Sequence, residues 1–485
     1  MSNLPVSKHW IDGVWLESGQ PGDSIDPATS EVIGRHFVAG PEEAQKAINA
    51  ARRCFLEGSW RRDRNLRARV LNRLADAFQA HTGELVDLLG RENGKVGRHA
   101  HLEVDAVPQC FRFNAALALT EYGRAASVAP GSLSIVVREP VGVAGVIAPW
   151  NSPVALVIRS LAPALAAGCT AAVMLPKQTA QVNALIARLV SEIEELPQGA
   201  VNIFTGGYEA GNVLVTSPDV PVISFTGSTA TGRTISANAA RRLKRLGLEL
   251  GGKTPMIVFG DADLSAVVPT IVDALIVFAG QFCMTGSRLL VERNIADQLI
   301  ERLKDRLALV KLGPAADPSS EMGPLIDKPN VERVDQMVER AIATGAKVIL
   351  RGGPATEAPL NKGAFYRPTL LEVEDSKLEI VQKEVFGPVL IVQRFDDEAE
   401  AIQLANDNEY GLSASVWSRD SDLPLRVGMA LESGTVWING WARLADQFEE
   451  GGFKQSGQGR MRGLAVIDDF IEYKHIALQP GLARA

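Results

Sequence analysis

Short apolar runs alternate with helical stretches between residues 141 and 227, and this rhythm limits the possible fold more than any other feature. The strand-like runs are VGVAGVIAPW (141–150), TAAVML, VNIFTG and PVISFTG (221–227). Helix-like ALVIRSLAPALAAG and a helical pattern over residues 179–196 separate the first three of them. Apolar strands joined by helices form parallel sheets with both faces covered, and such sheets bind ligands at the carboxyl ends of their strands. The segment therefore predicts an α/β fold with a dinucleotide-binding domain.

Different patterns flank this segment on both sides. From Pro41 to Tyr122, apolar residues recur every three or four positions and glycines stop each helical pattern. A two-residue alternation over Ser132–Arg138 predicts a protruding strand. After Gly252 a second α/β rhythm starts with TPMIVFG and continues to EVFGPVLIVQRF, so we expect a second domain with its own sheet.

The length and charge of the chain restrict its class and its partners. Its 485 residues suffice for about three domains, and a content of 22% charged and 46% hydrophobic residues is ordinary for a soluble globular protein. A formal net charge of -7 argues against a nucleic-acid or anionic-membrane partner, so the basic run at residues 241–245 is interpreted as a solvated helix face. Because we find neither a signal-peptide core nor a membrane span, we expect a cytoplasmic protein.

The stretch RLGLELGGKTP contains the phosphate-loop pattern GxxxxGK[ST] over residues 247–254. A phosphate loop follows a buried strand and opens a helix, so that its backbone N–H groups cradle phosphates. Here residues 239–246 predict an exposed helix and residues 255–259 predict a strand, which is the opposite order. In addition, the carboxylate of Glu249 would repel an incoming phosphate. The pattern is therefore interpreted as accidental, and Glu249 becomes the residue of interest.

The cysteines and histidines predict neither a disulfide framework nor a metal site. The four cysteines are Cys54, Cys110, Cys169 and Cys283. They lack CxxC spacing, and each is expected to be a buried apolar residue unless neighbouring groups activate its thiol as a nucleophile. His99 and His101 could share one face of a strand, but their polar surroundings predict a helix, on which this spacing diverges. We therefore expect two exposed histidines and no metal.

Three short stretches place reactive side chains at turns beside predicted strands. Residues 149–153 bend between two prolines and present the amide of Asn151, a suitable oxyanion donor. Residues 225–232 end a strand and precede a helix, where backbone N–H groups could meet a pyrophosphate. Residues 280–288 place Cys283 amid small and polar residues before another strand. Each stretch taken alone also fits an ordinary structural turn.

Taken together, these stretches resemble the aldehyde dehydrogenase superfamily, because ELGGK at residues 249–253 and EVFGP at residues 384–388 accompany them in the family's order. The resemblance covers nearly the whole chain, from WIDGVW and IDPATSEVIG to GGFKQSGQGR near the end. Motifs in this order and wording are highly specific to the family.

The resemblance implies a particular division of the chain. A Rossmann-type dinucleotide-binding domain would comprise residues 1–122 and 142–251, and a second α/β catalytic domain would comprise residues 252–452. Residues 123–141 and 453–485 would form a small β oligomerisation arm with bridging segments. Such arms imply a homodimer or a homotetramer, between which the sequence does not choose.

By the same likeness Cys283 is the nucleophile, Glu249 is the general base, and Asn151 with the backbone N–H of Cys283 forms the oxyanion hole. A thiolate adds to an aldehyde, the oxyanion is held by N–H donors, and its collapse expels hydride to nicotinamide. Glu249 then activates the water that hydrolyses the remaining thioester. Relatives that pass the acyl group to coenzyme A generally lack this glutamate, so its presence favours hydrolysis. The positions that match cofactor contacts are Ile147, Trp150, Lys177, Phe225, Gly227, Ser228, Leu250, Glu384 and Phe386.

Two departures from the family pattern concern the cofactor. Met174 stands where the family usually has a lysine, and Lys177 stands where it often has a glutamate beside the adenosine ribose. Loss of a carboxylate and gain of an ammonium remove repulsion toward a 2′-phosphate, so we expect NADP to be accepted beside NAD. The alternative is that Lys177 merely points to solvent.

Other departures concern the rate and the substrate. Ser160 and Met461 replace residues that assist proton traffic in the family, which affects efficiency rather than reaction type. Ser152, Arg159 and Glu450 are candidates for a polar substrate pocket, although Arg159 could instead simply pair with a glutamate. The expected substrate is a small aldehyde of unknown identity. A second hypothesis is a non-catalytic relative retained as a binding or structural protein.

Overall fold

The apolar runs of the first half pair into one large sheet in the computed structural model, which describes residues 4–120 and 122–478. Within these residues the sheet has eight strands, in the order β24 (Gly457–Gln458), β12 (Arg245–Glu249), β11 (Val222–Thr226), β8 (Val143–Ile147), β9 (Thr170–Pro176), β10 (Val201–Gly206), β2 (His9–Ile11) and β3 (Val14–Leu16). Strands β8 to β12 are mutually parallel, whereas β2 and β24 pair antiparallel at the two ends. The predicted parallel sheet is confirmed.

Helices cover both faces of this sheet, as apolar parallel strands require. The helices of this lobe are α1 (Pro41–Glu57), α2 (Arg64–Ala80), α3 (Thr82–Glu92), α4 (Gly97–Val104), α5 (Val107–Thr120), α6 (Pro153–Ala167), α7 (Ala180–Ser191), α8 (Tyr208–Thr216) and α9 (Thr229–Ala240), with a 3-10 turn at Lys177–Thr179. One core joins α2 and α5 to α7 with one face, and a second core joins α1, α8 and α9 with the other. The sequence predicts one helix over residues 65–94, but the structure divides this stretch between α2 and α3, because His81 leaves the helical conformation (φ -109°, ψ 19°).

The second half of the chain builds its own sheet, as predicted. In the described residues its seven strands follow the order β15 (Lys347–Leu350), β18 (Thr369–Glu372), β19 (Val389–Phe395), β14 (Arg288–Glu292), β13 (Pro255–Val258), β21 (Ser413–Trp417) and β22 (Thr435–Ile438). Its helices are α10 (Leu264–Ile276), α11 (Arg293–Ala308), α12 (Lys328–Ala343), α13 (Glu379–Gln382), α14 (Glu398–Asn406) and α15 (Leu423–Ala430), with 3-10 turns at Val277–Gly280 and Leu360–Lys362. Helices α10 to α12 pack on one face, and α14 and α15 pack on the other.

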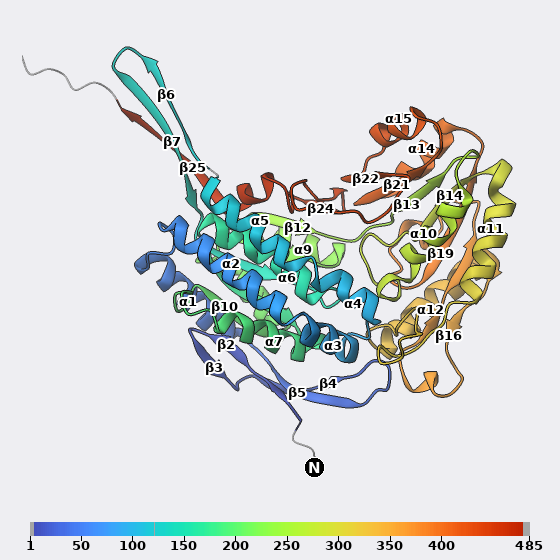
Figure 1. Cartoon of the computed structure of the whole chain (residues 1–485), viewed down its shortest axis with the longest axis horizontal. Helices are drawn as coiled ribbons and strands as arrows, with labels where there is room; N and C mark the ends of the chain where they lie inside the picture. The colour runs from blue at the N-terminus through green and yellow to red at the C-terminus, as the bar shows by residue number, and fades with distance from the viewer. Residues whose placement is uncertain (1–3, 121, 479–485) are drawn as a thin grey trace, which may run out of the picture.

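A narrow three-stranded arm projects from the first lobe (Figure 1). It contains β6 (Arg124–Ala129), β7 (Ser132–Pro140) and β25 (Ile471–Leu478), which follows a 3-10 turn at Ala465–Phe470. The predicted protruding strand is thus confirmed as β7. Smaller sheets join β1 (Val6–Ser7), β5 (Val32–Val38) and β4 (Gln20–Ile25), β16 (Gly353–Pro354) and β17 (Tyr366–Arg367), and β20 (Tyr410–Gly411) and β23 (Phe453–Lys454).

One local prediction is wrong. Residues 239–246 are not an exposed helix, because α9 ends at Ala240, Leu243 adopts a left-handed conformation (φ 51°), and β12 begins at Arg245. The basic run at residues 241–245 therefore lies in a turn rather than on a helix face. A strand does precede residues 250–254, but the chain then enters β13 instead of the helix that a phosphate loop requires.

The histidine pair lies on α4, as predicted, but only His101 is exposed. His99 is buried, because its imidazole packs edge-on against the ring of Phe278 in the second lobe. In the described part of the chain, no cluster of three or more His, Cys, Asp or Glu side chains has the geometry to hold a metal ion. Nor is any helix there long and apolar enough to cross a membrane.

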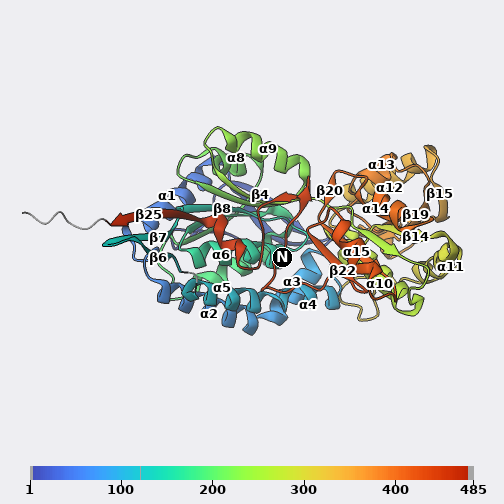
Figure 2. The same cartoon turned by 90° about the horizontal axis from the view of Figure 1, so that it is seen from above.

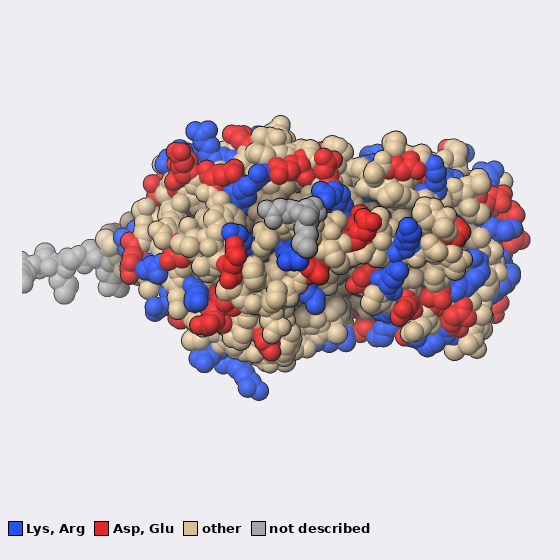
Figure 3. Space-filling view, turned by 90° about the horizontal axis from the view of Figure 1, so that it is seen from below, with Lys and Arg blue, Asp and Glu red and all other residues tan. Residues whose placement is uncertain are grey.

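The two lobes lie side by side (Figure 2). Residues that end or follow β8, β11 and β12 line a cavity together with residues of the second lobe. On the described face in Figure 3, basic and acidic side chains are interspersed and neither sign dominates a large area. The arrangement places the three predicted reactive turns at the junction of the lobes.

Candidate active site

A cavity of about 320 Å³ lies at the junction of the two lobes. It is lined by Pro149, Trp150, Asn151, Leu156, Thr226, Gly227, Ser228, Glu249, Leu250, Gly251, Cys283, Asn330, Arg333, Glu384 and Phe386. The first lobe contributes loops that follow parallel strands, and the second contributes the loop before β14 and residues of α12. The cavity thus gathers the predicted nucleophile, base and amide around one space.

Most of the predicted cofactor positions also line this cavity, namely Trp150, Gly227, Ser228, Leu250, Glu384 and Phe386. Ile147 and Phe225 are buried near the ends of β8 and β11 and do not line the cavity. Lys177 instead lines a larger hollow of about 1090 Å³, together with His36, Tyr208 and Glu209. Ser152, Arg159 and Glu450 do not line the cavity itself.

The loop that carries Cys283 is held in an unusual backbone conformation. Phe278 and Ala279 have positive φ values of 49° and 56°, which cost free energy and cluster at functional sites. Gly280 has no room for a side chain, because a Cβ there would lie 2.3 Å from the carbonyl carbon of Gly387. The Cys283 loop and the EVFGP motif therefore touch through their backbones.

The amide of Asn151 is directed toward the Cys283 loop. Its Nδ2 donates a hydrogen bond to the carbonyl oxygen of Gln281 at 3.0 Å. Glu103 accepts from the first N–H groups of α6 at 2.8 and 3.1 Å, and Lys95 forms a buried ion pair with Glu103. The Asn93 amide donates to the carbonyl of Trp150 at 2.7 Å. These contacts fix the turn that presents Asn151 to the cavity.

The Cys283 thiol is partly exposed to the cavity and lies in an environment that disfavours its charge. Withdrawal from bulk water raises the pKa of this thiol above its ordinary value, and the nearby carboxylates of Glu450, Glu249 and Glu384 raise it further. The guanidinium of Arg159 opposes them. The thiol is thus protonated at neutral pH in the protein alone, and a nucleophilic step needs a base or an added positive charge.

Glu249 ends β12 with its carboxylate buried between the lobes. Burial raises the pKa of this carboxyl to about 7, while Arg159 lowers it and Glu450 raises it. The Oε2 atom lies 3.8 Å from Nη1 of Arg159, and Oε1 has no hydrogen-bond partner within the described chain. A carboxylate with a pKa near neutrality and a free acceptor atom is suited to remove a proton from water.

Arg159 pairs with a glutamate, which was one of the two alternatives left open by the sequence. Its Nη1 lies 2.6 Å from Oε1 of Glu450, and its Nη2 donates to Oγ1 of Thr226 at 3.1 Å. Ser152 is buried 3.4 Å from Nζ of Lys95, so its hydroxyl belongs to the scaffold beneath the Asn151 turn.

The first lobe offers a cradle for a dinucleotide. At the start of α9, Ser228 accepts from the N–H of Thr231, and the free N–H groups of such a helix end attract phosphate. A Cβ at Gly227 would lie 2.5 Å from the ring of Phe225, so a bare backbone is needed there. Met174 packs its thioether against Gly206. Lys177 is exposed and lines the larger hollow.

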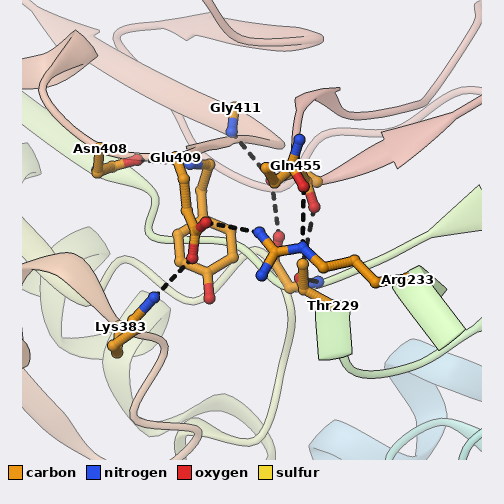
Figure 4. A network of polar contacts seen from close by, with 10 residues as sticks. Thr229, Arg233, Lys383, Asn408, Glu409, Gly411 and Gln455 are labelled. Atoms are coloured by element: carbon orange, nitrogen blue, oxygen red, sulfur yellow. Dashed lines mark hydrogen bonds and ion pairs between the residues drawn. The ribbon is translucent and has the colours of Figure 1, made fainter. Parts of the chain in front are cut away.

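A polar network ties this cradle to the second lobe (Figure 4). Arg233 of α9 pairs with Glu409 at 2.6 Å and donates from Nε to the side-chain oxygen of Gln455 at 3.0 Å. Lys383 pairs with the same Glu409 at 2.8 Å and directly precedes Glu384 in the chain. A single exposed ion pair contributes little, but this shared glutamate links α9 to the loop of Glu384.

Some residues of the cavity were not predicted from the sequence. Arg333 of α12 donates to the carbonyls of Val385 at 2.8 Å and Phe386 at 3.4 Å, so it fixes the EVFGP loop. Asn330 lines the cavity one turn earlier. Both stand on the polar side of an amphipathic helix, where nothing in the sequence distinguishes them from solvated residues.

Comparisons with known proteins agree with this geometry. Residues 15–476 match the model of the aldehyde dehydrogenase family. The chain is 39% identical to the betaine aldehyde dehydrogenase of Bacillus subtilis, over 96% of both proteins, and 37% identical to the 2-aminomuconic semialdehyde dehydrogenase of Danio rerio, over 98% of both. A crystal structure of betaine aldehyde dehydrogenase from Staphylococcus aureus with NAD+ superposes with a TM-score of 0.96 at 36% identity, covering 98% of this chain and 95% of that one. The chain belongs to the aldehyde dehydrogenase family.

Proposed function

We propose that this aldehyde dehydrogenase converts a polar aldehyde to its carboxylic acid through a thioester on Cys283. Asn151 supports the oxyanion, and Glu249 activates the hydrolytic water. The observation that carries the proposal is the convergence of a thiol, an amide and a buried carboxylate with a pKa of about 7 around one cavity.

The residue types account for each step. The sulfur of Cys283 forms a bond to the carbonyl carbon, its proton leaves to a base, and the oxygen becomes an oxyanion that the Asn151 amide stabilises. After oxidation a thioester remains on the sulfur. Glu249 takes a proton from water while the water oxygen bonds to the carbonyl carbon, and the carbon–sulfur bond then breaks to release the acid.

The residues of the cavity suit the nicotinamide and pyrophosphate parts of a dinucleotide. Ser228 and the N-terminus of α9 would hold its pyrophosphate, while Glu384 and Phe386 would contact its nicotinamide half. When bound, NAD+ brings a positive charge near the thiol and accepts the hydride that the substrate carbon loses. Lys177 would face the adenosine half from the larger hollow.

The position of Lys177 leads to a prediction on cofactor choice. We expect the enzyme to accept NADP+ beside NAD+, because an exposed ammonium at this hollow attracts a 2′-phosphate. Lys177→Glu should lower kcat/KM for NADP+ relative to NAD+ roughly tenfold, since one charge-assisted contact is replaced by repulsion. Lys46→Glu on α1 makes the same charge change at an exposed site outside the hollow and should leave the ratio unchanged. An unchanged ratio in Lys177→Glu, or strong NAD+ preference in the parent, would disprove the assignment.

The substrate class is tested by a panel with both cofactors. The names of the relatives favour betaine aldehyde, an aminoaldehyde or 2-aminomuconic semialdehyde over an apolar aldehyde such as hexanal. We expect the largest kcat/KM for one of the polar aldehydes. A clear preference for hexanal would reject the polar class, and no NAD(P)H burst with any aldehyde would favour a non-catalytic binding protein.

We also propose that the arm makes the protein a homodimer or homotetramer. β25 is an edge strand of the arm, with Ile476 and Leu478 exposed on one face. Ile476→Asp with Leu478→Asp should shift the protein to a monomer in light scattering, because charges would be buried in the interface. Leu309→Asp with Met429→Asp changes two apolar side chains elsewhere, which are more exposed than Ile476 and Leu478, and should leave the mass unchanged. A monomeric parent, or an unaltered mass in the arm variant, would contradict the proposal.

A further inference from the structure

A chain of alternating charges runs from Glu249 toward the surface. Arg159 lies between Glu249 and Glu450, at 3.8 and 2.6 Å, and Arg462 donates to the other oxygen of Glu450 at 2.9 Å. Arg462 also pairs with Asp446. Only 5% of Arg159 and 3% of each glutamate are exposed, so solvent screens these charges little.

The two contacts of Arg159 are unequal, and this inequality matters for a base. Its contact with Glu450 is a close ion pair, whereas Glu249 lies beyond hydrogen-bond distance. The positive charge of Arg159 therefore acts on Glu249 without a hydrogen bond to either carboxylate oxygen. The Oε1 atom of Glu249 has no hydrogen-bond partner among the described residues. Thr226 accepts a further hydrogen bond from Arg159, which fixes the direction of the guanidinium.

We propose that Arg159 and Glu450 act as a positioning pair for Glu249, in which Glu450 holds Arg159 close enough to favour the carboxylate but too far away to bind it. This inference rests on the proposed role of Glu249 as the base that hydrolyses the thioester. It assigns to Arg159 and Glu450 a role in the base step.

Within the described residues, Arg159 is the cation that forms an ion pair with Glu249, at 3.8 Å. The other groups around the carboxylate are Arg460, the backbone N–H of Gly452 and the thiol of Cys283. Burial raises the pKa of Glu249 most; Arg159, the Gly452 N–H and Arg460 lower it, and Glu450 raises it. Removal of Arg159 should therefore raise this pKa, and removal of Glu450 should lower it.

The opposite signs give a test that a merely structural role would fail. The protonated Glu249 carboxyl is followed by pH-difference infrared spectroscopy and assigned by its loss in Glu249→Gln. The midpoint should lie at about 7 in the parent. It should rise by roughly one unit or more in Arg159→Gln and fall by a comparable amount in Glu450→Gln, as expected for charges within about 4 to 6 Å. Arg159→Lys keeps the charge and should restore most of the parent midpoint.

The pH profile of turnover should move with the same signs. With the best aldehyde of the panel, the acidic limb of kcat should shift upward in Arg159→Gln, which costs about fivefold at pH 7 for a one-unit rise. In Glu450→Gln the limb should shift downward, and the plateau should fall because a weaker base is held closer to Arg159. Arg394→Gln, which breaks a partly buried pair with Glu372 in the second sheet, should leave both readouts unchanged.

Two outcomes would overturn the inference. These are an infrared midpoint that does not move, and midpoints that move in the same direction in both variants. If no aldehyde is turned over by the parent while the infrared midpoints move oppositely, the proposed function fails but the charge pair stands. If Arg159→Gln does not fold, Glu450→Gln still decides the inference, because its midpoint should fall, and a midpoint that stays or rises would overturn the pair.

Discussion

Replacing Cys283 with alanine should reduce NAD(P)H formation from aldehyde by about four orders of magnitude or more, because no other group can form the covalent bond to the substrate. The loss should appear in both the burst and the steady state when absorbance is followed at saturating cofactor. Cofactor binding, measured by quenching of tryptophan fluorescence, should persist, since the dinucleotide cradle belongs to other residues.

The other cysteines provide the control for this variant. All four lie in described residues, and Cys283 alone among them lines the cavity. Cys54 and Cys110 are buried outside the cavity, so an aldehyde bound in the cavity cannot reach either thiol, and burial also raises the thiol pKa of Cys54 to about 11 and of Cys110 to about 12. Cys54→Ala should retain the activity of the parent. Retention of substantial activity by Cys283→Ala would mean that another nucleophile performs the reaction.

Replacing Glu249 with glutamine should stall the enzyme after oxidation. Glutamine cannot accept a proton from water, so thioester hydrolysis should slow by roughly 10² to 10⁴-fold while acylation continues. A burst of NAD(P)H close to one equivalent per active site should therefore be followed by a slow steady state in stopped-flow absorbance. In the parent, the hydrolytic rate should rise with pH through about 7 as the carboxyl ionises, and the variant should lose this rise.

Glu92 supplies a matched control for Glu249. It is also buried, with a pKa raised to about 7 mainly by burial, and it accepts the N–H groups of Gln181 and Val182 in the first lobe. Glu92→Gln removes the same charge away from the cavity and should retain full steady-state turnover at saturating NAD+. Unimpaired turnover in Glu249→Gln, or an identical burst pattern in both variants, would contradict the role of Glu249.

The sequence predicts the sheets well where apolar runs are uninterrupted. The strands β8 to β11 are apolar along most of their length because both faces are buried, so their pattern is visible without a structure. β12 escapes prediction because its first residues are only half-buried, and Arg245 pairs at the surface with Glu472 of the arm. Strands of two or three residues, such as β1 and β2, are too short to show a period.

The residues of the candidate site also differ in how far the sequence predicts their positions and contacts. Asn151, Glu249 and Cys283 are recognisable because each stands in a stretch that resembles a family motif, and the stretches of Asn151 and Cys283 also adjoin predicted strands. The sequence left open whether Arg159 pairs with a glutamate, and it could not single out Glu450, because the two residues stand 291 positions apart and several charged side chains could have competed. The contacts of Arg333 with the EVFGP loop depend equally on how α12 packs. The division at residues 122, 142, 251 and 452 stays a prediction.

The central claim is that Cys283 carries the substrate as a thioester until Glu249 releases it. The most direct test is mass spectrometry of acid-quenched Glu249→Gln after mixing with aldehyde and NAD+. The account predicts one acyl group per chain, mapped to the peptide of Cys283, which appears only when the oxidised cofactor is present. An acyl group on another residue, or a burst of NADH without any covalent adduct, would contradict the account.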